Sequence, residues 1–272
     1  FFSTGYSLPD MEPRTERAHE AFLRAELGGT RFASVRWVAE TGSTNDDLSE
    51  LARKGGGEQV LITDLQTAGK GRRNRVWTAP TRSGVLMSVL LRGVVPSDGF
   101  WSVGALALAA SEAIDELIDV PCSLKWPNDV MAGPPDGQRK VAGVLAQLVD
   151  QAIVVGIGMN ANWPDDVPAD MAERGTAINR HTLDRAMVDR PALAADVLRR
   201  AIGHLDSERH VLRSAWKARC STLGQQVRLD LETGAITGTA VDIAPDGALQ
   251  LENEVGISTH QVGDVVHLRP AT

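Results

Sequence analysis

The pattern of apolar residues changes after Cys220, and this change limits the possible folds more than any other feature of the sequence. Five short strand candidates then follow at close intervals: Val227–Leu231, Ala235–Ile243, Ala248–Leu251, Gly256–His260 and Val265–Leu268. Turn sequences such as Pro245-Asp246-Gly247 separate them, which is typical of a small β-domain. Roughly 50 residues form only a marginal core, so we expect this domain to pack on a larger one.

The residues before Cys220 mix buried strands with helices. Strand-like apolar runs occur at 35–38, 60–63, 85–91, 123–125, 141–149 and 153–157. Helical patterns cover 16–26, 101–119 and 191–219, the last with a break near 203–207. The sequence therefore predicts an N-terminal extension (1–33), an α+β domain (34–219) and a small β-domain (220–272).

Charge and cysteine content exclude several classes of protein. The chain has 272 residues, a net charge of −7 and two widely separated cysteines, Cys122 and Cys220. An acidic balance argues against a protein devoted to nucleic acid, and no apolar run approaches the roughly 18 residues of a membrane span. Residues 1–13 show no secretory signal, and sparse cysteines fit a reducing compartment. We expect a cytoplasmic protein with neither DNA nor a membrane as partner.

A glycine-rich basic segment, Gln66–Trp77, lies between two buried strands. Four cations fall within positions 70–75, interleaved with Gly69 and Gly71. Glycine lets a backbone approach a ligand closely, and Lys and Arg neutralise phosphate. A solvated basic loop remains the alternative, and the segment is not a Walker A loop because G-x-x-x-x-G-K-[ST] is absent.

Three further segments carry polar side chains beside apolar runs. In Lys125-Trp126-Pro127-Asn128-Asp129, Asn128 could read a base edge and Asp129 could bind Mg²⁺; a structural turn with an Asp129–Lys125 pair is the alternative. Lys140 enters a buried strand just past a glycine-proline turn. Thr41-Gly42-Ser43-Thr44-Asn45 reads as a helix cap that also suits a polar ligand.

Other kinds of chemistry lack their residues. The six histidines show no metal-ligand spacing, and no G-x-S-x-G nucleophile elbow occurs. The remaining candidates are cations, amides and acids, which stabilise phosphate charge rather than form covalent intermediates.

Five segments in this order resemble the biotin protein ligases: TGSTN (41–45), QTAGKGRRNRVW (66–77), KWPNDV (125–130), KVAGVL (140–145) and GIGMN (156–160). The resemblance covers roughly residues 35–269. It implies a mixed β-sheet flanked by helices, of the class II synthetase-like type that biotin and lipoate ligases share. A C-terminal SH3-like barrel would follow.

The resemblance also implies a reaction in two steps. Biotin's carboxylate would attack the α-phosphate of MgATP, giving biotinyl-5′-AMP and pyrophosphate, and an acceptor lysine would then displace AMP. The acceptor would be a biotin carboxyl carrier domain of an acyl-CoA or pyruvate carboxylase. ATP, Mg²⁺ and biotin would be the small molecules involved, with no tightly bound prosthetic group.

Roles follow by resemblance for individual residues. Those expected at biotin are Ser43, Thr44, Asn45, Gln66, Lys70, Gly71, Arg72 and Lys140. Arg72, Asn128 and Asn160 would bind the nucleotide, and Asp129 would face Mg²⁺. The expected catalytic residues are Lys140, Arg72, Lys125 and Asp129, whereas Trp126 would form part of the pocket wall.

Two departures from the family's loop, usually G-R-G-R-x-G-R-x-W, concern its grip on phosphate. Lys70 replaces an arginine and loses the bidentate fork, and Asn74 replaces a glycine. Asn tolerates a left-handed backbone, so the loop shape can survive. We therefore expect weaker retention of the adenylate.

Two other functions stay open at this stage. A lipoate–protein ligase shares the chemistry, but a lipoyl tail has no ureido group for Ser43, Thr44 and Asn45. A non-catalytic biotin sensor would not need Lys125, Asp129 and Lys140 together. About 40 residues precede Ser43, too few for a DNA-binding domain, so we expect no repressor function. We expect a monomer or a weak homodimer, since a free edge of the sheet could pair with a second copy. We also expect residues 164–176 to form a loop near the nucleotide.

Overall fold

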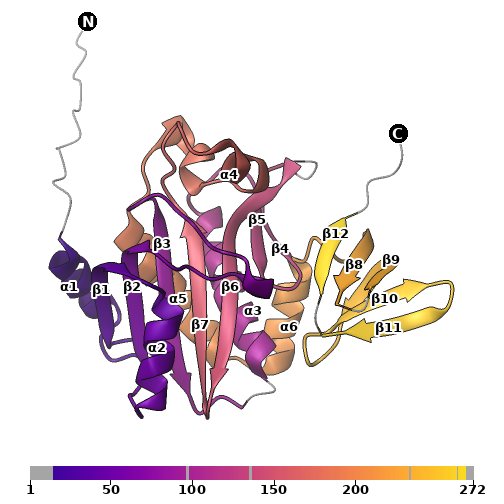
Figure 1. Cartoon of the computed structure of the whole chain (residues 1–272), viewed down its shortest axis with the longest axis horizontal. Coiled ribbons are helices and arrows are strands. Elements are labelled where there is room, and N and C mark those ends of the chain that lie inside the picture. The colour runs from indigo at the N-terminus through magenta and orange to yellow at the C-terminus, as the bar shows by residue number, and fades with distance from the viewer. Residues whose placement is uncertain (1–14, 96–97, 135–136, 233, 262, 268–272) are drawn as a thin grey trace, which may run out of the picture.

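The computed structural model describes residues 15–95, 98–134, 137–232, 234–261 and 263–267. Its larger part is built on a seven-stranded sheet (Figure 1). In sheet order the strands are β1 (Val35–Thr41), β2 (Gln59–Gln66), β3 (Gly84–Arg92), β7 (Ala152–Asn160), β6 (Arg139–Val149), β5 (Asp129–Ala132) and β4 (Cys122–Lys125). Because β1 and β2 are parallel and the other neighbours antiparallel, the sheet is mixed, as predicted.

Helices cover both faces of this sheet. They are α1 (Glu16–Glu26), α2 (Thr44–Arg53), α3 (Gly99–Asp115), the short α4 (Ala169–Arg174), α5 (Arg190–Asp206) and α6 (Arg209–Ala218). On β3, Leu90 packs with Leu48 of α2, whereas its neighbours Val89 and Leu91 belong to the core that holds α3 and α5. Since side chains alternate across a strand, α2 lies on the opposite face from α3 and α5.

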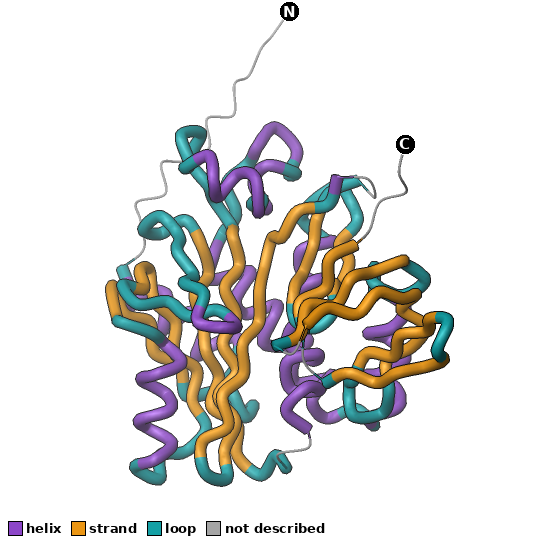
Figure 2. Tube along the Cα trace, turned by 45° about the vertical axis from the view of Figure 1, so that its right-hand side comes forward, coloured by secondary structure: helices purple, strands orange, loops and turns teal. Residues whose placement is uncertain are grey.

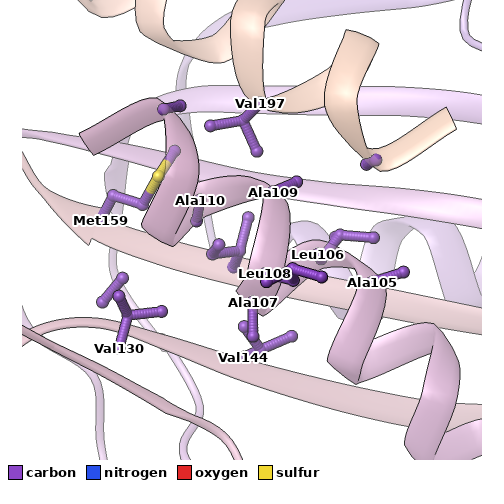
Figure 3. Close-up of a cluster of buried hydrophobic side chains, with 14 of the residues drawn as sticks. Ala105, Leu106, Ala107, Leu108, Ala109, Ala110, Val130, Val144, Met159 and Val197 are labelled. Carbon is purple, nitrogen blue, oxygen red and sulfur yellow. The ribbon is translucent and has the colours of Figure 1, made fainter. Parts of the chain in front are cut away.

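Helix α3 forms the centre of the core. Its residues 104–110 are buried without exception, so this helix is apolar on every side rather than along one stripe. Figure 3 shows it between Val197 of α5 and strand residues Val130, Val144 and Met159. The helix ends at Asp115, four residues before the predicted end at 119.

The start of α2 follows the predicted capping. Ser43 precedes the helix with an extended backbone, and its hydroxyl accepts from the Asp46 amide at 3.5 Å. The helix ends at Arg53, beside Gly55 with its positive φ of 77°. The cap places Ser43, Thr44 and Asn45 directly over the sheet.

The small C-terminal domain is a five-stranded antiparallel sheet of the SH3-like type (Figure 2). In sheet order its strands are β11 (Gly256–His260), β10 (Leu249–Asn253), β9 (Gly234–Ile243), β8 (Gln226–Leu231) and β12 (Asp264–His267). It docks through buried indoles: Trp101 donates to the Pro245 carbonyl at 2.7 Å and Trp126 to the Gly247 carbonyl at 3.0 Å. The expectation that it packs on the larger domain is confirmed.

Two predictions about elements need correction. Residues 164–176 contain the helix α4, where the sequence predicted only a loop; six residues are too few to show a helical period. Strand β5 was also missed, because Asp129–Ala132 is short and begins inside the Lys125–Asp129 motif, for which a structural turn was one alternative. The N-terminal extension contributes α1, which packs on β1 and α5, and the three-way division of the chain stays a prediction. The described residues contain no helix long and apolar enough to cross a membrane.

Candidate active site

A cavity of about 230 Å³ opens on the face of the sheet next to α2. All the predicted site residues line it except Asn160, and they come from α2, the basic segment, the β4–β5 hairpin and β6. Asn160 is 5% exposed, and its side-chain amide donates to the Thr176 carbonyl at 3.0 Å. In this structure Asn160 therefore joins β7 to the segment after α4 and does not line the cavity.

One end of the cavity is polar but uncharged. Asn45 donates to the Leu145 carbonyl at 3.3 Å, and the Gln66 side-chain oxygen accepts from the Thr44 amide at 2.9 Å. Ser43, Thr44 and Asn45 are each at most 5% exposed. Buried hydroxyl and amide groups fixed in this way suit a ligand with its own hydrogen-bond donors and acceptors.

The lining of the cavity also carries an excess of positive charge. Five cations line the cavity (Lys70, Arg72, Arg75, Lys125 and Lys140), against two carboxylates, Asp129 and Asp264. Lys140 Nζ lies 2.5 Å from Asp129 Oδ1 and 5.3 Å from the centre of the Trp77 ring. Asp129 therefore pairs with Lys140, and not with Lys125 as the structural-turn alternative predicted. An excess of three positive charges in a partly buried wall favours an anionic ligand.

Burial changes the acid–base properties of two of these cations. The pKa of Lys125 is lowered by burial, with Asp129 opposing the change and Lys140 adding to it. Burial also lowers the pKa of Arg72, against the attraction of Asp264 and Asp129. A cation that is poorly hydrated binds an anion more strongly than a fully hydrated one does.

The basic segment folds over the cavity as a tight loop. Residues Arg72–Asn74 form a short 3₁₀ turn, and both Arg73 and Asn74 have a positive φ, of 54° and 59°. The expectation that Asn74 accepts a left-handed backbone is confirmed. Lys70 pairs with Asp46 of α2 at 2.6 Å, so its ammonium is already occupied by a carboxylate.

Arginines of this loop converge on the C-terminal domain. Asp264, the first residue of β12, pairs with Arg72 at 3.5 Å, with Arg73 at 3.3 Å and with Arg75. Arg72 also donates to the Gly263 carbonyl at 3.0 Å and reaches Asn128 Oδ1 at 3.4 Å. The small domain is therefore part of the cavity wall, a role that no local signal in the sequence indicated.

Two glycines of β7 make room for the site. A Cβ on Gly158 would lie 2.5 Å from the Trp77 ring, and one on Gly156 would lie 2.1 Å from Asn45 Oδ1. In the sequence this segment stood out only as GIGMN, one of the five segments of the resemblance. Trp77 was missed as a site residue; its ring lines the cavity, and its buried indole N–H has no hydrogen-bond partner among the described residues.

Comparisons with known proteins agree with this geometry. Residues 39–162 match the biotin/lipoate A/B protein ligase family, and residues 222–268 match the biotin protein ligase C-terminal domain. The biotin–[acetyl-CoA-carboxylase] ligase of Mycobacterium tuberculosis is 36% identical over 92% of this chain and 96% of that protein. The Escherichia coli bifunctional ligase/repressor BirA is 29% identical over 98% of this chain and 82% of that protein.

The fold is equally similar to solved structures. The Aquifex aeolicus biotin protein ligase in complex with biotin and ATP has a TM-score of 0.72 and 30% sequence identity, covering 88% of this chain and all of that one. The resemblance predicted from the five sequence segments is thereby confirmed. The chain belongs to the biotin protein ligase family and is a ligase.

Proposed function

We propose that this protein activates biotin with MgATP and transfers it to a lysine of a carrier domain. One observation supports this most strongly: a single cavity is lined both by uncharged polar side chains from the start of α2 and by five cations against two carboxylates. Biotin has the same division, since a ureido ring lies at one end of the molecule and a carboxylate at the other. The structural relative from Aquifex aeolicus was solved with both biotin and ATP.

The first step joins two anions that repel each other. A carboxylate oxygen of biotin forms a bond to the α-phosphorus, and the bond from that phosphorus to the pyrophosphate oxygen breaks. Lys140 would lie where the two anions meet and neutralise charge on both, and Arg72 would hold the α-phosphate from the loop; both residues line the cavity. Fixed cations in a partly dry site stabilise this transition state without any enzyme nucleophile.

Asp129 fits the magnesium that accompanies ATP. Mg²⁺ usually takes one or two protein carboxylates and completes its shell with phosphate oxygens and water. The described residues hold no cluster of three or more His, Cys, Asp or Glu side chains that could form a full metal cage. Asp129 and the nucleotide would bind the ion together, and the ion would screen the charge on the leaving pyrophosphate. Lys140, which pairs with Asp129 in this structure, would then pair with the biotin carboxylate instead.

In the second step, the amine of the acceptor lysine attacks the biotinyl carbonyl of the adenylate. A bond from carbon to nitrogen forms, the bond from that carbon to the phosphate oxygen breaks, and AMP leaves with the proton that the amine gives up. Arg72 would stabilise the AMP phosphate as it departs, and Lys125 would add charge from the β4 side. The loop would shield the anhydride from water between the two steps.

We propose as acceptor the biotin carboxyl carrier domain of a carboxylase, in the cytoplasm. Relatives from Mycobacterium tuberculosis and Paracoccus denitrificans are biotin–[acetyl-CoA-carboxylase] ligases, which supports acetyl-CoA carboxylase before pyruvate carboxylase. The net charge of −7 supports a ligase without DNA binding. A gel-shift assay with the promoter DNA of biotin genes should show no complex, and a biotin-dependent complex would refute this part.

Transfer is tested by measuring the intact mass of a carrier domain after incubation with the protein, MgATP and either biotin or lipoate. We expect a biotinyl adduct on one lysine and no lipoyl adduct. Lipoylation would place the protein with the lipoate ligases. Biotin binding without any adduct would contradict the ligase proposal and indicate a sensor.

A further inference from the structure

Ser88 lies beneath the uncharged end of the cavity without lining it. It is fully buried on β3 and pairs with Leu61 of β2 on one side and Gly156 of β7 on the other. Its side chain lies on the α2 face of the sheet, since Leu90, two residues along, packs against α2. A buried hydroxyl at this position must find its hydrogen-bond partners at the start of α2.

The partners of Ser88 fix the direction of a short hydrogen-bond chain. Ser88 Oγ lies 2.6 Å from Asn45 Oδ1 and 2.6 Å from Thr44 Oγ1. An amide oxygen only accepts, so the single Ser88 proton goes to Asn45, and the Thr44 hydroxyl donates to Ser88. The Asn45 amide is oriented independently, because its nitrogen donates to the Leu145 carbonyl.

This chain decides what the cavity wall offers to a ligand. With its proton directed at Ser88, the Thr44 hydroxyl presents lone pairs that accept. Asn45 keeps one free N–H that donates. Without the Ser88 hydroxyl, the Thr44 proton can turn to Gln66 Oε1, which lies 3.1 Å away, and Asn45 Oδ1 loses its donor. Residue 156, which pairs with Ser88 on the neighbouring strand β7, must also remain a glycine, because a Cβ on Gly156 would collide with Asn45.

We propose that Ser88 is a positioning residue that sets the polarity of the biotin-binding end through Thr44 and Asn45. A ureido group has two N–H donors and one carbonyl acceptor, so it needs an acceptor and a donor in fixed places. This inference rests on the proposed function, because it takes biotin as the ligand. It also makes Ser88 a determinant of selectivity for the ureido group over a plain alkyl chain.

The test compares two stable adenylate analogues by calorimetry: biotinyl-sulfamoyl-adenosine and octanoyl-sulfamoyl-adenosine. They share the adenosine part, so only the acyl end differs. For Ser88→Ala we expect roughly 10- to 100-fold weaker binding of the biotinyl analogue, and octanoyl binding within about twofold of the unmodified protein. Ser88→Cys replaces the hydroxyl with a somewhat larger and weaker donor and should show a smaller loss of the same selectivity.

Ser111→Ala is the matched control. Ser111 is also fully buried, but its hydroxyl donates to the Leu108 carbonyl within α3, so this variant should bind both analogues normally. Equal weakening of both analogues in the Ser88 variants, or no weakening, would overturn the role of Ser88. Failure of the unmodified protein to bind the biotinyl analogue would instead refute the proposed function.

Discussion

Single residues in this site matter for the volume that they fill or leave open as much as for their charge. Gly158 leaves the volume that the Trp77 ring fills, and that ring in turn lies against Lys140. The sequence showed the glycine, but not the tryptophan 81 positions earlier that needs it. Contacts of this kind arise only when β7 and the loop are brought together by the sheet.

Gly158→Ala should therefore reduce biotin adenylation by about 10- to 100-fold, because a small displacement of Trp77 also displaces Lys140 from its reacting position. The measurement is kcat/KM for pyrophosphate release. Gly57→Ala is the control, since nothing lies within 4 Å of a Cβ at that position. Normal kinetics in Gly158→Ala would show that the ring can move without cost.

His19 is a buried histidine that makes the stability of the folded protein depend on pH. Burial lowers the pKa of His19 from its usual 6.5, and Arg190 lowers it further, against weaker effects of Asp64, Asp189 and Glu16. A histidine with a lowered folded pKa is protonated first in the unfolded chain. Stability is therefore full above pH 6.5 and falls as the pH drops below it.

His19→Phe should make the folded protein less sensitive to acid. The ring contact with Trp37 is kept and the unpaired Nδ1 is removed. Between pH 7.5 and 5.5 we expect the variant to lose about 2–4 °C less in melting temperature than the unmodified protein. If His19→Phe and the unmodified protein were equally sensitive to acid, His19 would not be the source of this pH dependence.

At the scale of elements, the basic loop is held at several points. Lys70 is paired with Asp46 of α2, and Asn74 has the left-handed backbone that glycine adopts most easily. Helix α2 and the strands of the larger sheet other than β5 were predictable because their apolar patterns and the Ser43 cap are local signals. The course of the loop was not, because its anchors lie on α2 and in the C-terminal domain.

Lys70→Arg together with Asn74→Gly should slow the release of biotinyl-AMP. An arginine offers phosphate two donors in a planar fork, and glycine at position 74 removes the strain of a side chain in the left-handed region. We expect about a threefold slower release in a stopped-flow chase with unlabelled adenylate. An unchanged rate would mean that these two positions do not limit retention.

At the scale of the whole molecule, the C-terminal domain completes the active-site wall. Asp264 holds three arginines of a loop that lies about 190 positions earlier in the chain. The sequence predicted both the small domain and its docking on the larger one. It contained no pattern that joins Asp264 to Arg72, since a charge pair across domains leaves no spacing to recognise.

Asp264→Asn should accelerate adenylate release about tenfold, because Arg72, Arg73 and Arg75 would repel one another without their shared carboxylate. Trypsin should also cut the loop sooner in this variant. Glu254→Gln, an exposed acid of the same domain, removes equal charge and should change neither measurement. Unaltered release in Asp264→Asn would separate the domain from loop control.

We expect this cavity to form biotinyl-AMP with Lys140 as its main cation. Mass spectrometry of the protein incubated with biotin and MgATP tests it most directly. We predict biotinyl-AMP with the unmodified protein and with Lys54→Ala, an exposed lysine just after α2, and a loss of at least about 100-fold with Lys140→Ala. Full adenylate formation by Lys140→Ala would contradict the account.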